Sequence, residues 1–359
     1  MGNVHVDLGT KSYNIEIERG LLEKVGKKVK ALLPKAEKAA VITDSNVGPL
    51  YADVLRRSLE REGLAVTVLT FKAGEESKNL ITLGNLYGGL ARAGLTRSDM
   101  VVALGGGVTG DMGGLAAATF LRGIAFIQIP TSLLAAVDSS VGGKVAVDLP
   151  EGKNLVGAFY QPKGVFIDPN LLQTLPGRYL HDGMAEVIKY GCICDRDLFG
   201  RLEALQDDGD LLTHGDEIIE ACCNIKARIV EHDEFDTGER MLLNFGHTLG
   251  HAMEKTFRFD TYSHGEGVAI GMVLLTRQAE KLGLTVPGTA ERIEGLLKKF
   301  NLPVSVQMDQ ADFLKAIALD KKKRGSEITL VLLKAIGESF LQKIEFSGLP
   351  KFLPDGDAS

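Results

Sequence analysis

The sequence predicts an α/β N-terminal domain, built on a Rossmann-like parallel sheet, followed by a mostly α-helical C-terminal domain. Up to Pro176, short apolar segments alternate with amphipathic helical segments, and this alternation is typical of a parallel sheet covered by helices on both faces. After Pro176, most apolar residues recur at the helical period. The 359 residues suffice for two domains of ordinary size, which we place at residues 1–177 and 178–359.

The individual elements follow from the same patterns along the chain. The predicted strands are short, apolar and rich in β-branched residues, and they lie in residues 38–44, 64–71, 99–107, 124–132 and 163–176, the last of them ending at a turn at Pro169. Helical periodicity in this half covers residues 48–63 and 79–94. In the second half it covers residues 178–191, 215–235, 264–283 and 288–301, and residues 326–344 predict one or two late strands.

The composition indicates a soluble globular protein and narrows the choice of partners. Hydrophobic residues make up 45% and charged residues 25% of the chain, and the formal net charge is −6. Because no basic block stands out, nucleic acid and anionic membrane surfaces are disfavoured as partners. We find no signal peptide and no apolar run long enough for a membrane helix, so we expect a cytoplasmic protein. A small anionic substrate remains open, since local lysines can outweigh a mildly acidic surface.

The four cysteines, Cys192, Cys194, Cys222 and Cys223, lack the C-x-x-C spacing typical of thiolate zinc sites. A four-cysteine zinc site could still be assembled on paper. We expect buried, reduced thiols instead of a metal site or a disulfide.

A glycine-rich turn, "ALGGGVTGDMGG", joins the strand predicted at residues 99–107 to a helix. Gly105, Gly107 and Gly110 satisfy the G-x-G-x-x-G pattern, which lets the backbone approach a pyrophosphate at a helix N-terminus. The acidic residue that usually follows about 20 positions later is missing, and Asp44, at a strand end, precedes the turn. The pattern therefore favours a dinucleotide over a merely structural turn, but in an unusual order.

Three histidines lie close together in "NFGHTLGHAMEKTFRFDTYSHGEG". His247 and His251 are four residues apart and would share one face of a helix, whereas His264 follows a loop. Glu186, on an otherwise apolar helix, could complete a catalytic metal site of two histidines and a carboxylate. The alternative is an ion pair between Glu186 and Lys189, one turn on, with histidines that bind no metal.

Four cations stand out, and two of them, Lys144 and Lys153, follow predicted strands, where parallel sheets place their ligands. Lys144 in "SSVGGKV" and Lys153 in "EGKN" lie in glycine-rich loops, Arg122 lies in "FLRG", and Arg240 lies four residues before Asn244. Each could be a solvated surface charge. Together they indicate a phosphate or carboxylate ligand.

With these motifs in view, the chain resembles the 3-dehydroquinate synthases from end to end. The resemblance rests on "AGEESK", "LGGGVTGDMGG", "FLRG", "PTSLLAAVDSSVGGKVAVDLPEGKN", "GMAEVIKYG", "RMLLNFGHTLGHA", "YSHGEGVAIGM" and "DKK". It implies NAD and one divalent metal ion, zinc or alternatively cobalt, as cofactors, a phosphosugar substrate, and a homodimer.

The resemblance also assigns residues. It implies metal ligation by Glu186, His247 and His264. It implies NAD binding by Asp44, Asn46, Glu75, Lys78, Gly106, Gly107, Val108, Asp111, Thr131, Ser132, Lys153, Leu171 and Thr174. It implies substrate binding by Arg122, Asp138, Lys144, Asn154, Glu186, Lys189, Lys226, Arg240, Asn244, His251 and Lys322, with Lys321 as the alternative to Lys322. The implied catalytic residues are His251, Lys144, Lys189, Arg240, Asn244 and Asp236; the family usually has Glu at the last position, so a proton-relay role for Asp236 is uncertain.

The implied reaction converts 3-deoxy-D-arabino-heptulosonate 7-phosphate to 3-dehydroquinate and phosphate. It comprises transient oxidation of the C5 alcohol by NAD, elimination of phosphate, return of the hydride, ring opening and intramolecular aldol closure. Three alternatives remain: another sugar-phosphate cyclase, a metal-dependent polyol dehydrogenase of related fold, and a non-catalytic binding protein. Arg240, Asn244, His251 and "DKK" together favour the dehydroquinate branch.

Overall fold

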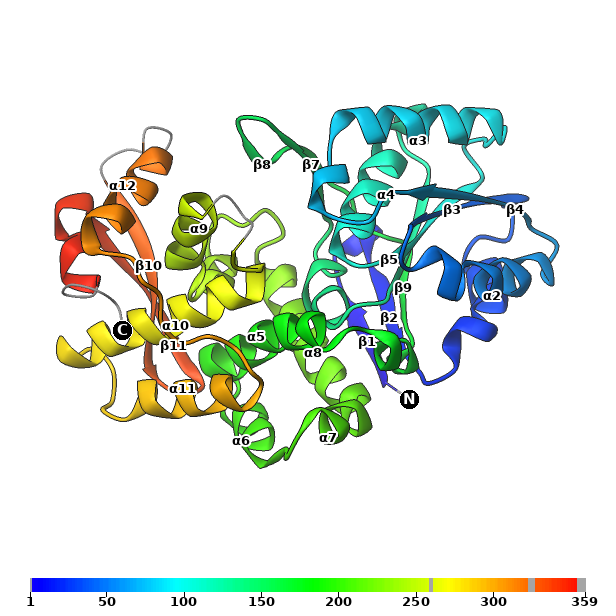
Figure 1. Ribbon diagram of the computed structural model, residues 1–359. Helices are drawn as coiled ribbons and strands as arrows, with labels where there is room; N and C mark the ends of the chain where they lie inside the picture. The colour runs from blue at the N-terminus through cyan, green and yellow to red at the C-terminus, as the bar shows by residue number, and fades with distance from the viewer. Residues whose placement is uncertain (1, 258–260, 322–326, 354–359) are drawn as a thin grey trace. The chain divides into compact units, whose positions relative to one another are not determined.

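The structure is a computed structural model that describes residues 2–257, 261–321 and 327–353 (Figure 1). The chain forms two compact units. The first comprises residues 1–176 and 214–235, and the second comprises residues 177–213 and 236–359. The chain first changes from one unit to the other after Pro176, and neither unit is a single continuous segment. Helix α8 (Gly215–His232) belongs to the first unit, where it packs on strand β1 (Gly2–Val6).

The first unit is built on a seven-stranded sheet with the order β1-β2-β9-β6-β5-β3-β4. Its strands are β1, β2 (Tyr13–Ile17), β3 (Lys38–Asp44), β4 (Ala65–Phe71), β5 (Met100–Gly105), β6 (Ala125–Pro130) and β9 (Gly164–Ile167). All neighbours pair in parallel except β1 and β2, which are antiparallel. The predicted α/β class with a parallel sheet is confirmed, and the five strands predicted from the sequence are all present.

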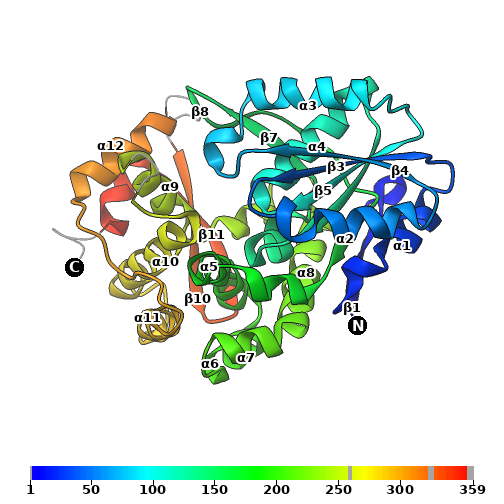
Figure 2. The ribbon, with the colours of Figure 1, turned by 45° about the vertical axis from the view of Figure 1, so that its right-hand side comes forward.

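Helices cover both faces of this sheet, as the strand pattern predicted (Figure 2). They are α1 (Val25–Leu32), α2 (Gly48–Glu60), α3 (Leu80–Arg92) and α4 (Gly107–Thr119). A hydrophobic core lies on each face of the sheet. Alternate residues of β5 pack into one core or the other, because side chains alternate along a strand. Val102 packs with Leu55 and Leu59 of α2 on one face, and Val101 packs with Leu86 of α3 on the other.

Two features of the first unit differ from the sequence prediction. The antiparallel pair β1–β2 extends the sheet, although five-residue strands gave too short a pattern to be recognised. Lys144 and Lys153 do not lie in glycine-rich loops but on a hairpin of strands β7 (Lys144–Leu149) and β8 (Gly152–Phe159). Most of β8 is exposed, so its sequence carries little of the apolar alternation that identifies a strand.

The second unit is mostly helical, as predicted. Its helices are α5 (Gly177–Cys194), α6 (Arg196–Ala204), α7 (Asp208–Thr213), α9 (His247–Thr256), α10 (His264–Lys281), α11 (Thr289–Lys299) and α12 (Gln310–Lys321). The late strands are an antiparallel hairpin of β10 (Glu327–Ala335) and β11 (Glu338–Glu345). Leu274 of α10, Phe313 of α12 and Leu332 of β10 share one core. In the described ranges, no helix has the length and apolar character needed to cross a bilayer.

Short non-α segments connect these elements and carry several of the residues discussed below. They are the single turns or 3₁₀ helices Gly9–Lys11, Leu21–Glu23, Glu75–Ser77, Phe120–Arg122, Pro169–Thr174, Glu239–Asn244 and Phe346–Phe352, and the π-helical turn Ala135–Ser139.

Glycines allow α9 and α10 to approach each other at backbone distance. Gly246, immediately before α9, has the left-handed backbone angle φ +80°, which favours glycine. A Cβ added to Gly271 of α10 would lie 2.1 Å from the Gly246 carbonyl oxygen. Because the obstacle is backbone, side-chain repacking cannot relieve it. Glycine at these positions thus sets the spacing of the two helices that carry the three clustered histidines.

We therefore predict that Gly271→Ala lowers the free energy of unfolding by about 1–3 kcal/mol or more, since the added methyl overpacks the α9–α10 crossing. Gly295→Ala on α11 is the matched control, because nothing lies within 4 Å of its added Cβ. The control should be stabilising by up to about 1 kcal/mol. Urea unfolding of both variants measures the difference, and equal stabilities would contradict the backbone contact.

Candidate metal centre and cofactor site

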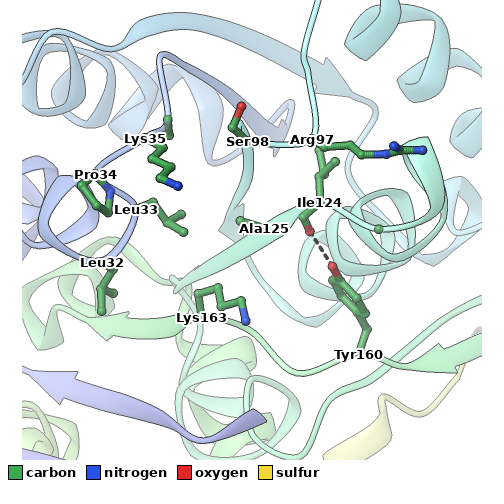
Figure 3. A pocket seen from close by; sticks show the side chains of 12 residues that line it. Leu32, Leu33, Pro34, Lys35, Arg97, Ser98, Ile124, Ala125, Tyr160 and Lys163 are labelled. Atoms are coloured by element: carbon green, nitrogen blue, oxygen red, sulfur yellow. Dashed lines mark hydrogen bonds between the residues drawn. The ribbon is translucent and has the colours of Figure 1, made fainter. Parts of the chain in front are cut away.

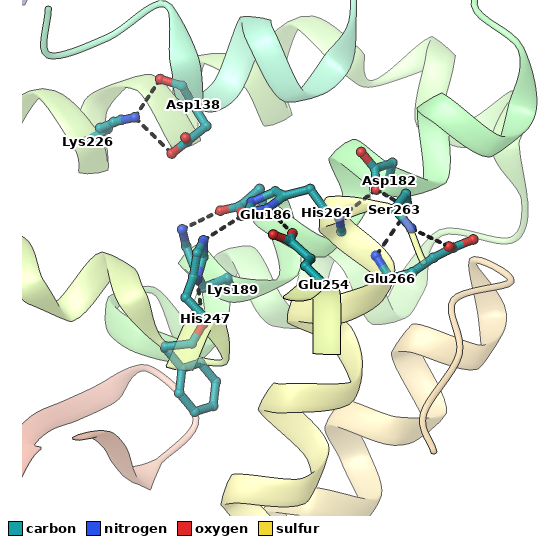
Figure 4. Close-up of polar contacts among 12 residues, drawn as sticks. Asp138, Asp182, Glu186, Lys189, Lys226, His247, Glu254, Ser263, His264 and Glu266 are labelled. Carbon is teal, nitrogen blue, oxygen red and sulfur yellow. Dashed lines mark hydrogen bonds and ion pairs between the residues drawn. The ribbon is translucent and has the colours of Figure 1, made fainter. Parts of the chain in front are cut away.

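Glu186, His247 and His264, the three side chains predicted to bind a metal, come together within the second unit (Figure 4). They project from α5, α9 and α10. Each offers a ligand atom, and these atoms lie within 4.8 Å of one another. Glu186 Oε1 lies 3.3 Å from Nε2 of His247 and 3.1 Å from Nε2 of His264. A carboxylate and two imidazoles that converge in this way match the protein ligands of a catalytic zinc site.

The second nitrogen of each of these imidazoles has its own acceptor. His247 Nδ1 lies 3.1 Å from the Phe245 carbonyl oxygen, and His264 Nδ1 lies 3.1 Å from Glu254 Oε1. When Nδ1–H of each ring donates to these oxygens, Nε2 of both rings faces Glu186. Histidines that bind metals are usually held in this manner.

His251 lies one turn beyond His247 on α9, and its ring centroid is 5.5 Å from that of His247. It is exposed. A second group of potential ligands, His251, Glu254 and His264, also lies within 4.8 Å. Within α9, helical spacing alone therefore does not distinguish a ligand from its neighbour.

Burial and charge perturb the titration of this cluster. Although burial alone would raise the pKa of the Glu186 carboxyl, the Lys189 ammonium and His247 outweigh it and hold that pKa well below 4.5. Burial lowers the pKa of His247, against the influence of Glu186. Burial would also lower the pKa of His264, but hydrogen bonds to Glu186 and Glu254 raise it to about 10. Protonated His264 therefore carries a positive charge between the carboxylates of Glu186 and Glu254.

Lys189 pairs with the second oxygen of Glu186, Oε2, and both side chains are buried. The sequence left a Glu186–Lys189 pair and a metal site as alternatives. In the structure the two arrangements coexist, because Lys189 uses Oε2 and the histidines face Oε1.

Two buried acids near the cluster were not predicted. Glu254 of α9 is 5% exposed and contacts His264, as described above. Asp182 of α5 accepts hydrogen bonds from Ser263 Oγ at 2.5 Å and Gly265 N at 2.6 Å, on either side of His264. Asp182 precedes Glu186 by one turn, so the argument that singled out Glu186, an acid on an apolar helix face, also applied to Asp182.

Three further predicted residues of this unit lie in the segment that precedes α9. Arg240 is buried and Asn244 exposed, both on the 3₁₀ helix Glu239–Asn244. Asp236 has a left-handed backbone, with φ +60°. Lys322 lies outside the described residues, and Lys321 ends α12.

In the first unit, the predicted cofactor residues lie at the carboxyl ends of the parallel strands. The chain passes from β3 to β4 on one side and later places β5 on the other side of β3. Such a switch point is where open α/β sheets bind ligands. Asp44 ends β3 and Gly105 ends β5, side by side in register. The other predicted residues that follow these and neighbouring strands are Asn46, Glu75, Lys78, Gly106, Gly107, Val108, Asp111, Thr131, Ser132, Leu171 and Thr174.

Helix α4 begins at this edge without a side-chain cap. Its N-cap residue is Gly106, and the first helical bond runs from Gly110 N to Gly106 O. The amide groups of the first turn are therefore available to an anionic ligand. Asp44 has a structural task here: its Oδ1 accepts bonds from the amides of Asn46 and Val47, and its Oδ2 accepts one from Thr109 Oγ1 at 3.2 Å.

A network of charged and polar side chains around the buried Lys78 links five of the predicted residues. Lys78 Nζ lies 2.6 Å from Asp111 Oδ2 and donates to Asn154 Oδ1 at 2.5 Å. Glu75 Oε1 lies 3.9 Å from Lys78 and 3.6 Å from Lys153. Burial raises the pKa of Asp111 to about 6, although Lys78 opposes this shift. The hairpin β7–β8, which the sequence prediction missed, is what brings Lys153 and Asn154 to the network.

The remaining predicted substrate residues of this unit are placed by separate elements. Lys226 of α8 donates to Asp138 Oδ1 at 2.8 Å (Figure 4). Lys144 is the exposed first residue of β7, directly after Gly142 and Gly143, both in the left-handed region. Arg122 is exposed after α4 and has φ +69°.

A cavity of about 500 Å³ lies at the opposite end of the sheet, beside the amino ends of β3, β5, β6 and β9 (Figure 3). Its lining includes Lys35, Arg97, Tyr160 and Lys163. None of the predicted site residues lines it. This hollow is therefore distinct from the edge that carries the glycine loop.

The cysteines take no part in these sites. None of the four, all of which lie in the described residues, forms a disulfide; three are buried and Cys194 is half-buried. Burial raises the pKa of the Cys223 thiol to about 12, so it does not act as a metal-binding thiolate at neutral pH.

Solved structures share this architecture over nearly the whole chain. A 2-deoxy-scyllo-inosose synthase complexed with carbaglucose-6-phosphate, NAD+ and Co2+ superposes with a TM-score of 0.86 at 26% identity, covering 97% of this chain and 98% of that one. A 2-epi-5-epi-valiolone synthase from Streptomyces hygroscopicus subsp. jinggangensis, with NAD+ and Zn2+ bound, gives a TM-score of 0.84 at 25% identity, covering 95% of each chain. The fold is that of the sugar-phosphate cyclases.

Sequence comparison narrows this class. Residues 68–182 match the family model for the N-terminal part of 3-dehydroquinate synthase, and residues 183–323 match that for the C-terminal part. The 3-dehydroquinate synthase of Clostridium acetobutylicum is 52% identical over 354 residues, which is 98% of this chain and 99% of that protein. The chain belongs to the 3-dehydroquinate synthase family.

The raised pKa of Asp111 predicts a pH dependence of stability. The carboxyl titrates near 3.8 in the unfolded chain and near 6 in the folded one. Its stabilising contribution is therefore full below about pH 3.8 and is lost as the pH rises through about 6. Asp111→Asn does not titrate, so its free energy of unfolding relative to the wild type should increase between pH 4 and pH 7. The ion pair with Lys78 forms only with the ionised carboxyl and is already contained in the folded-state pKa of Asp111, so it adds no further pH dependence. Urea unfolding across the range provides the measurement, and a relative stability that falls with pH would refute the assignment.

Proposed function

We propose that the protein is a 3-dehydroquinate synthase, a phosphate-eliminating lyase that converts 3-deoxy-D-arabino-heptulosonate 7-phosphate to 3-dehydroquinate and phosphate. The observation that carries the proposal is the buried Glu186 carboxylate, shared between Nε2 of two histidines and a buried lysine. This arrangement occurs in a chain whose first unit carries an uncapped glycine turn at a switch point. We further propose, from the family resemblance, a cytoplasmic homodimer.

The residues fit both cofactors. Glu186, His247 and His264 would hold a divalent metal ion, Zn²⁺ or Co²⁺. The first turn of α4 would hold the NAD pyrophosphate, with Asp44 shaping the loop beside it. When bound, NAD supplies a reversible hydride acceptor at the C5 alcohol, and the metal ion supplies a Lewis acid for the substrate hydroxyls.

The other steps of binding depend on side chains of the protein itself. Lys189 keeps Glu186 ionised and therefore ready to bind a cation. Lys144, Arg122 and Arg240 are cations suited to the carboxylate and phosphate of the substrate. His251 is exposed on α9, one turn beyond His247, and the family resemblance assigns it to the substrate. Asn244 and Asp236 belong to the same segment of the second unit.

A coupled assay tests this function. Purified protein with NAD, Zn²⁺ and 3-deoxy-D-arabino-heptulosonate 7-phosphate should release one phosphate per substrate consumed, with no net gain at the NADH absorption band. The reason is that a hydride removed and returned within one turnover leaves NAD unchanged. Glu186→Gln serves as the inactive control.

Each alternative function gives a different result. Net NADH without phosphate would indicate a polyol dehydrogenase. Phosphate released only from another sugar phosphate would indicate a different cyclase. Tight binding with neither signal would indicate a non-catalytic binding protein.

The proposed ligand set predicts that replacing the three histidines by alanine, one at a time, affects Zn²⁺ binding to different extents. His247→Ala and His264→Ala should each weaken Zn²⁺ binding by more than about 100-fold, beyond the loss that follows removal of an outer partner. His251→Ala, on the same helix, is the matched control and should retain one ion per chain. Elemental analysis after gel filtration measures the bound metal. If His251→Ala lost as much metal as His247→Ala, the ligand set would be wrong.

A further inference from the structure

His264 occupies an exposed position for a metal ligand. It is the first residue of α10, and its side chain is 33% exposed, against 12% for His247. The first residues of a helix lack the full set of backbone hydrogen bonds. The ring of His264 therefore depends on its neighbours for its orientation more than a residue in the middle of a helix does.

Two carboxylates supply this support from different helices. Asp182 holds the backbone on both sides of His264, through Ser263 Oγ and Gly265 N. Ser263 also forms a capping box with Glu266, which closes the start of α10. Glu254 holds the ring itself, with Oε1 at 3.1 Å from Nδ1 (Figure 4).

We infer that Glu254 is a positioning residue of the metal centre, which fixes the Nδ1–H tautomer of His264 and directs Nε2 to the ion. The inference rests on the proposed function, in which Glu186, His247 and His264 hold the metal. Phe245 does the same for His247 through a neutral carbonyl oxygen. Glu254 does it through a carboxylate, which increases the basicity of the imidazole more strongly.

The geometry opposes a role for Glu254 as a ligand of the same ion. Its oxygen faces Nδ1 of His264, whereas Glu186 faces Nε2, on the other side of the ring. One ion cannot bind to both nitrogens of the same imidazole ring, because their lone pairs point in different directions. Glu254 is also almost fully buried, at 5% exposure, so a carboxylate there needs a polar partner. An Nδ1–H group that donates to it meets that need.

The experiment compares the wild type with Glu254→Ala, Glu254→Gln and Glu280→Ala. Zn²⁺ affinity, measured by competition with a chromophoric chelator, should fall by about 10–100-fold in Glu254→Ala. Glu254→Gln should lose less, because its amide oxygen still accepts from Nδ1–H. Glu280→Ala is the matched control: Glu280 is a half-buried acid of α10 that accepts a backbone bond from Ala290 N at 2.7 Å. It should keep wild-type affinity.

A second readout reports the tautomer directly. In zinc-loaded protein labelled with ¹⁵N-histidine, the Nδ1 proton of His264 should be shifted downfield and protected from exchange, and Glu254→Ala should abolish that protection. Thermal unfolding of the metal-free variants controls for loss of fold. The visible absorption of Co²⁺-substituted protein should change in Glu254→Ala and not in Glu280→Ala.

The possible results distinguish failure of the positioning role of Glu254 from failure of the proposed function. Wild-type affinity in Glu254→Ala, or an equal loss in Glu280→Ala, would overturn the positioning role. Two ions per wild-type chain, one of them lost in Glu254→Ala, would also overturn it, because Glu254 would then be a ligand of a second centre with His251 and His264. A wild-type chain that binds no divalent ion would instead refute the proposed function.

Discussion

The burial of Glu186 is the constraint on which the second unit depends. A fully buried carboxylate is costly unless it is paired and hydrogen-bonded, and this one is paired at both oxygens. With Lys189 and a protonated His264 as cations, and Glu186 and Glu254 as anions, the formal charges of the cluster sum to zero. A divalent ion that takes the place of the His264 proton enters a site that already accommodates positive charge there. The cluster thus explains why three helices must meet at one point.

Glycine makes that meeting possible. The α9–α10 crossing at Gly246 and Gly271 brings two helix backbones into contact, and it does so at the start of α9, next to His247. Ligands carried by helices hold their geometry better than ligands carried by loops. Asp182 extends the same principle to His264, since it fastens the first turn of α10 to α5. Packing in the second unit therefore determines the geometry of the metal site directly.

Much of this could be predicted from the sequence, and the failures have identifiable physical causes. The strands β3 to β6 followed from apolar periodicity, because buried strands leave a strong pattern. The β7–β8 hairpin is largely exposed and left almost none. Assignment of α8 to the first unit depends on its packing on β1, a contact between distant segments. For His247 and His251, spacing describes the face of a helix but not the direction of a ring nitrogen, which the Phe245 carbonyl determines. Resemblance to the family, and not spacing, separated them.

Both units pair lysine side chains with carboxylates. Lys78 and Lys226 in the first unit, and Lys189 in the second, each pair with a carboxylate of their own unit. Under the proposed function, a substrate with carboxylate and phosphate groups would compete with these internal partners for Lys189 and Lys226. A single anionic group gains little from such an exchange, because it replaces one ion pair by another. A ligand that also brings hydroxyl groups to a metal ion would gain interactions that the internal carboxylates do not provide. Internal pairing of this kind favours a ligand that contacts several groups at once. It contributes to specificity because a simpler anion must break an internal ion pair without gaining other contacts.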